Sequence, residues 1–129
     1  MCDIQFVIND YYDMLNLHKA LLEAKFHESP DNIYVSGSPI VAKLYNELLD
    51  RIAECEMQKK GKENWTNWRK ITNQNLYKER AIHNIIQFSQ WKDSDYQQKV
   101  DLIYNYFSPF HYTENELSHL IYEIDTKLQ

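Results

Sequence analysis

The sequence predicts an all-α fold, a single domain in which four to five helices pack as an irregular antiparallel bundle. Glycine is scarce, since Gly37 and Gly61 are the only two in 129 residues. Glycine costs about 1 kcal/mol relative to alanine in a helix interior, whereas sheets and tight loops use it freely. Apolar side chains also recur every three or four positions along most of the chain, which is the period of an amphipathic helix. Serine, threonine and proline stand where helices would begin.

Length and composition fit one domain, which we expect to span residues 1–129. Hydrophobic residues make up 43% of the chain and charged residues 26%, which is too apolar for a disordered chain. No apolar run approaches the roughly 18 residues of a membrane-spanning helix, and the first residues lack the basic region of a signal peptide. Cysteine is sparse, with Cys2 and Cys55, which favours a reducing compartment. We therefore expect a cytoplasmic protein without a membrane partner.

The first helix is expected to begin near Ile4 or Asn9 and to end at about Phe26. Its apolar residues form a wide face, so we expect this helix to be the most buried one of the bundle. Residues 4–8 are equally compatible with a short strand, because alternation and helical period cannot be separated over so short a stretch.

Turn signals in residues 27–38 predict a loop before the second helix. Ser38-Pro39 is a good helix start, because a serine oxygen can cap the helix and proline suits its first position. The second helix is expected to end near Lys60. A third helical stretch is predicted over residues 64–89, and its periodicity drifts in residues 72–75, where we expect a break or a kink.

Two further helices are predicted near the carboxyl end of the chain. Ser94 with Gln97 resembles a capping box, in which two residues three apart satisfy each other's backbone amides, and it would open the fourth helix. Ser108-Pro109 is expected to end that helix, because proline disfavours a helical residue before it. Thr113 with Glu116 forms a second capping box, which predicts the start of the fifth helix.

The motifs of several common enzyme and metal-binding classes are absent from the sequence. Two isolated glycines cannot supply a phosphate-binding loop or a dinucleotide fingerprint, and the Gly-x-Ser-x-Gly pattern of serine hydrolases is missing. The five histidines do not supply two Glu-x-x-His motifs on facing helices, which is the ligand set that metal-binding bundles use. We therefore expect no cofactor, no metal site and no catalytic residue, and we regard an enzyme as the less favoured class.

Among the five histidines, His18 has the strongest case for a chemical role. It lies in phase with the apolar residues of the first helix, and a buried histidine can serve in acid-base catalysis. We favour a histidine at the edge of the core that is hydrogen-bonded to a tyrosine or a carbonyl, because no nucleophile or second base is identifiable. The enzyme hypothesis would require a deep pocket with converging polar groups around His18.

Charge is distributed unevenly along the chain. Residues 59–80 carry seven basic and two acidic side chains, although the net charge of the whole chain is −5. This basic segment is open to three interpretations: a solvated or internally paired face, a docking surface for a protein, or a nucleic-acid site in which tryptophans stack on bases. The acidic chain as a whole repels a polyanion, which counts against nucleic acid. The candidate partner-binding residues are Lys59, Lys60, Lys62, Trp65, Trp68, Arg69 and Lys70.

The function that the sequence favours is binding to another protein, as a regulator or a small adaptor without catalytic activity. Small acidic helical proteins can act through electrostatic complementarity to a basic partner. This hypothesis predicts an exposed apolar or aromatic patch of several hundred Å². The alternative is nucleic-acid binding through residues 59–80. A homodimer is also open, because a twin subunit could cover the wide apolar faces.

Overall fold

Helices make up all the regular elements of the residues that the computed structural model describes, which are 3–60 and 64–129, with side chains described outside 57–64. The all-α prediction is therefore confirmed. The α-helices are α1 (Tyr11–Lys25), α2 (Ile33–Ser36), α3 (Pro39–Lys60), α4 (Asn64–Trp68), α5 (Asn75–Phe88), α6 (Tyr96–Phe107) and α7 (Glu114–Lys127). Two 3-10 turns, η1 (Ile71–Asn73) and η2 (Trp91–Asp93), precede α5 and α6. The described helices outnumber the four to five expected, because α2 forms within the predicted loop and the third stretch divides into α4 and α5.

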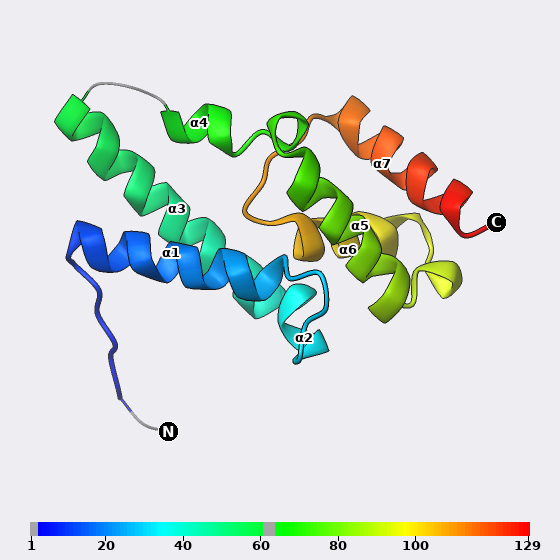
Figure 1. Cartoon of the computed structure of the whole chain (residues 1–129), viewed down its shortest axis with the longest axis horizontal. Helices are drawn as coiled ribbons and strands as arrows, with labels where there is room; N and C mark the ends of the chain where they lie inside the picture. Colours follow the sequence, from blue (N-terminus) through cyan, green and yellow to red (C-terminus); the bar gives the residue numbers. More distant parts are fainter. Residues whose placement is uncertain (1–2, 61–63) are drawn as a thin grey trace.

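The long helix α3 joins the two halves of the structure, because it packs against α1 on one side and against α6 on the other. In Figure 1, α1 and α3 lie side by side at one end, while α5, α6 and α7 gather at the other end. The core lies where these two groups meet. Its fully buried side chains include Tyr45, Leu49, Ile85, Ile103 and Phe107.

The first helix begins two residues after Asn9, the later of the two starts that the sequence suggested. A side-chain oxygen of Asp10 accepts a hydrogen bond from the backbone amide of Tyr12 at 2.7 Å, and this cap fixes the start of α1 at Tyr11. Residues 4–8 are neither helix nor strand, so a helix start near Ile4 and a strand over these residues are both wrong. Their apolar residues Ile4, Phe6 and Val7 are exposed instead of packed in the core.

The expectation that the first helix is the most buried is also wrong. Along α1, the buried side chains are Met14, His18 and Lys25. Leu17 and Leu21 belong to the same wide apolar face, but they are only partly buried. The reason is that α1 meets α3 along one edge of this face and leaves the neighbouring edge open.

Several helix boundaries follow the sequence closely. Ser38 Oγ accepts a hydrogen bond from the Val41 amide at 3.2 Å, which confirms the predicted cap of α3. Thr113 and Glu116 form the predicted capping box of α7. The box that opens α6 lies one residue later than expected and uses Asp95 and Gln98, because the Asp95 carboxylate is the side chain that reaches the N3 amide.

Gly37, between α2 and α3, has a steric reason to be glycine. A Cβ atom placed on Gly37 would overlap the ring of Tyr106 on α6. The missing side chain therefore lets α6 approach the turn before α3.

Candidate interaction groove

An apolar groove runs between α1, α3 and the segment 3–10, which precedes α1. Its volume is about 520 Å³. The residues that line it are Phe6, Ile8, Met14, Leu17, Leu21, Val41, Leu44, Glu47, Leu48 and Arg51, all of which are apolar except Glu47 and Arg51. We call this feature the α1–α3 groove.

The groove exists because α1 and α3 make their closest contacts on a different edge of α1. His18 points into the core, where its Nδ1 lies 2.6 Å from the hydroxyl of Tyr45 on α3. Leu17 and Leu21 lie about 100° and about 60° from His18 around the helix axis, so their side chains point to one side of the His18–Tyr45 contact. On α3, Leu44 and Leu48 are one turn apart and form the opposite wall.

Exposed apolar side chains extend the surface beyond the groove. Leu44 is 54% exposed, and Ile40, one turn earlier on α3, is also exposed. In the segment before α1, Phe6 is 89% exposed and borders the same groove. Single exposed apolar residues are ordinary, but several that border one groove are typical of an interaction surface.

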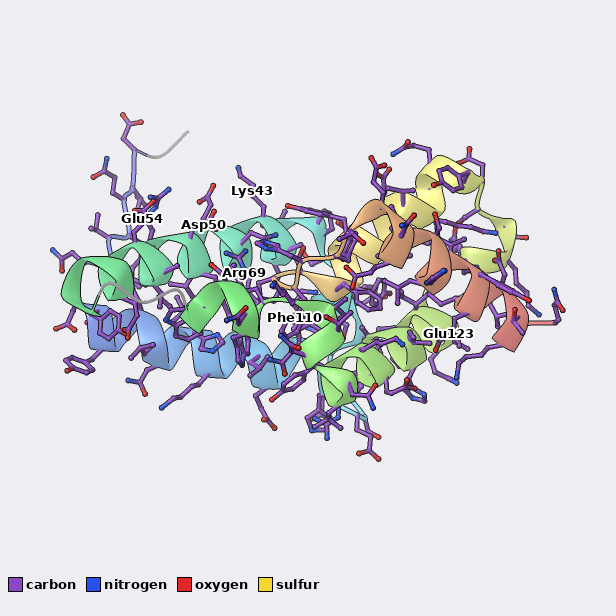
Figure 2. All side chains as sticks on the ribbon, turned by 90° about the horizontal axis from the view of Figure 1, so that it is seen from above. Lys43, Asp50, Glu54, Arg69, Phe110 and Glu123 are labelled. Carbon is purple, nitrogen blue, oxygen red and sulfur yellow. The ribbon has the colours of Figure 1, made fainter. Side chains whose placement is uncertain are left out.

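The charged residues on and beside the groove are mainly acidic. Glu47 lines it, and Asp13 lies one turn before Leu17 on α1. The one cation in the lining is Arg51, whose guanidinium makes an ion pair with Glu54 at 2.6 Å. Lys43 lies on the side of α3 that faces away from α1 (Figure 2). The groove therefore combines an apolar floor with a negative rim.

The two tryptophans predicted to bind a partner are both partly buried against the core. The rings of Trp65 and Trp68 meet the His18 ring edge to face, with centroids 5.3 Å and 5.1 Å away. The His18–Tyr45 hydrogen bond confirms the predicted histidine at the core edge. Burial, with a smaller contribution from Lys19, lowers the pKa of His18 to about 4, so its imidazole is neutral at pH 7.

Arg69, another predicted partner-binding residue, is 4% exposed and is used inside the chain. Its guanidinium donates hydrogen bonds to Asp50 at 2.7 Å, to Asn46 at 2.8 Å and to the carbonyl of Pro109 at 2.9 Å. Its backbone carbonyl accepts from the amide of His111. Arg69 thus fastens the segment after α4 to α3 and to the loop after α6. This is the internal pairing that was one interpretation of the basic segment.

Of the remaining predicted residues, Lys70 does not take part in the side-chain contacts of Arg69. Lys70 is exposed and its side chain points to solvent. The side chains of Lys59 and Lys60 and the whole of Lys62 lie outside the described residues. Partner binding by this group of residues stays a prediction.

A buried lysine on the opposite side of α1 from solvent holds three parts of the fold together. Buried Lys25 donates from Nζ to the carbonyls of Ser36 at 3.0 Å and Asn105 at 2.5 Å, and burial lowers its pKa to about 7.

In the described part of the chain, no three His, Cys, Asp or Glu residues cluster in a way that could hold a metal ion. Within the same residues, none of the helices has the length and hydrophobicity that crossing a bilayer requires.

Sequence reasoning did not identify the groove. Periodicity predicts that the wide apolar face of the first helix is buried, because it shows the width of that face but not how much of it a neighbour covers. The available signal was the width of the first helix's apolar face, which exceeds what one packing partner buries.

Comparisons of the chain with protein-family models, with curated proteins and with solved structures find no match.

Proposed function

We propose that this chain functions by binding another protein, and that the α1–α3 groove is the surface that receives it. The observation that carries the proposal is the exposed apolar wall around Leu44 in a groove of about 520 Å³. Water contact with such a surface is unfavourable, and a bound partner removes it.

The groove is suited to a helical ligand. It lies between two helices, and an amphipathic helix commonly binds such a groove by inserting apolar side chains at positions i, i+3 or i+4, and i+7. Each apolar side chain of the kind found at Leu44, Ile40 and Phe6 gains roughly 1–3 kcal/mol when it passes from exposure to full burial. A few such residues give enough free energy for a specific complex after the cost of association is subtracted.

Nucleic-acid binding through residues 59–80 has less support among the described residues. The positive charge of Arg69 is paired with Asp50, and the rings of Trp65 and Trp68 pack against the ring of His18. A stacking platform for bases needs aromatic faces that are open to solvent beside free cations.

Site-specific photo-crosslinking in the cells that produce the protein tests the proposal. The photoreactive residue p-benzoylphenylalanine replaces Leu44 in one variant and Leu76 in the control. The two leucines are matched, because they are 54% and 56% exposed, and Leu76 lies on α5 outside the groove. We expect irradiation to link a discrete second protein to the Leu44 variant and not to the Leu76 variant.

Two outcomes would contradict the proposal. If neither variant is crosslinked, or if both give the same products, the groove is not a specific docking surface. If the product has twice the mass of the chain, a second copy covers the groove, and binding to a different protein is refuted.

A further inference from the structure

We infer that the partner presents a basic amphipathic helix, with an apolar stripe for the α1–α3 groove and lysine or arginine residues on the flanks of that stripe. This inference rests on the proposed function and adds the chemistry of the partner. It is carried by the placement of charge around the groove.

The acidic side chains lie where the flanks of a bound helix would pass. Glu47 is exposed, lines the groove and lies between Leu44 and Arg51 on α3. On the α1 side, Asp13 is exposed and precedes Leu17 by one turn, and Asp10 precedes Met14 by one turn. Carboxylates therefore border both helical walls of the groove.

Among the cations of the same two helices whose side chains the structure describes, all but Arg51 are directed away from the groove. Lys19 lies two positions from both Leu17 and Leu21, which is about 200° around the helix and places it on the far face of α1. Lys25 is buried under α1, with its ammonium bonded to two backbone carbonyls. Arg51 is the cation on the groove itself, and both carboxylate oxygens of Glu54 lie 2.6 Å from one of its guanidinium nitrogens. A positively charged partner therefore meets little like-charge repulsion at the α1–α3 groove.

The same charges disfavour a second copy of this chain as the occupant. A twin subunit brings another net charge of −5 and a groove with the same acidic border. In a symmetric pair, each acidic border would face an equivalent acidic surface, which like-charge repulsion opposes. A basic helix gains from the same field, which also raises its rate of association at low salt.

A displayed peptide library tests the inference with a defined probe. Each member is an amphipathic helix of about 18 residues with leucine at i, i+3, i+4 and i+7, and its flanking positions vary among Lys, Arg, Glu and Gln. Selection uses the full chain, and peptides that also bind the Leu44→Glu variant are discarded. We expect the remaining groove-dependent peptides to be enriched in Lys and Arg on the flanks.

Charge reversal at the rim provides the matched control. The double variant Asp13→Lys, Glu47→Lys should weaken binding of the selected basic peptides on the order of tenfold and should turn the preference of the library toward Glu. The control double variant Glu79→Lys, Asp101→Lys makes the same change in net charge at exposed positions on α5 and α6. It should leave the preference for Lys and Arg in place.

The outcomes separate the two proposals. Groove-dependent peptides with no charge preference, or with acidic flanks, would overturn the basic partner and leave the protein-binding function standing. A library that yields no groove-dependent peptide would overturn both. An equal effect of the two double variants would mean that net charge, and not the rim, attracts the peptides, and it would also overturn the inference.

Discussion

Acidification should destabilise the fold through His18 in a pH range that the structure defines. The imidazole is buried, touches Trp65 and Trp68, and shares a hydrogen bond with Tyr45. Its pKa falls from 6.5 to about 4 in the folded protein, mainly because burial penalises the charged form. The unfolded chain exposes the ring and takes up a proton near pH 6.5, while the folded chain does not.

The sign of the effect follows from this difference in bound protons. Above pH 6.5 the ring is neutral in both states and contributes no pH dependence. Between pH 6.5 and about 4 the unfolded state binds one more proton, so the free energy of unfolding falls by about 1.4 kcal/mol per pH unit. Over the whole interval the loss is roughly 3 kcal/mol, a large part of the stability of a domain of this size.

Urea unfolding at several pH values between 4 and 7.5 measures this loss in the wild-type chain and in His18→Gln. Glutamine keeps a polar group for Tyr45 but takes up no proton, so the variant should lack the extra slope below pH 6.5. Comparing the two chains cancels the contribution of carboxylates that both contain. His83→Gln, at an exposed position on α5, is the control and should follow the wild type. The reasoning is refuted if His18→Gln and the wild type lose stability in parallel, or if NMR finds that His18 in the folded chain titrates near pH 6.5.

Two further predictions concern stability and are measured by urea unfolding at pH 7. Arg69→Met should lower the free energy of unfolding by about 2–4 kcal/mol. The reason is that the carbonyl of Pro109 and the side-chain oxygens of Asn46 and Asp50 lose the hydrogen-bond donor that Arg69 supplies. A loss below about 0.5 kcal/mol, which is typical of a surface site, would contradict this prediction. Gly37→Ala should cost about 1–3 kcal/mol, because its methyl group overlaps the Tyr106 ring, and an unchanged or increased stability would show that the ring moves aside freely.

Local signals in the sequence predict helix boundaries well when a polar side chain and the backbone agree. Ser38-Pro39 and the pair Thr113 with Glu116 act within one turn of the chain, so the start of α3 and that of α7 could be predicted without tertiary information. The sequence left the start of α1 open between Ile4 and Asn9, because the apolar residues before Asp10 continue the helical pattern although the chain there is not helical. The cap overrides the hydrophobic pattern, and periodicity alone does not show this.

The candidate site was harder to predict because it depends on how helices are oriented. Arg69 and Lys70 are neighbours in the basic segment, yet one is buried against Asp50 and the other is exposed. Charge counted along the sequence assigns both to one surface, although adjacent residues on a turn point in different directions. In the same way, Leu44 and Ile52 fit one apolar stripe on α3, but Ile52 is fully buried and Leu44 is half exposed.

The rotation of α1 about its own axis links the core to the groove. His18 is held by Tyr45, and about two turns further along α1, Lys25 is held by the carbonyls of Ser36 and Asn105. Turning α1 so that Leu17 and Leu21 moved inward would break these buried polar contacts and leave an unpaired charge and carbonyls away from water, which costs several kcal/mol. Burying the two leucines gains about as much or less, since both are already partly buried. Polar contacts on one edge of α1 therefore keep its apolar edge open, and for that reason the groove persists as a surface that a partner can use.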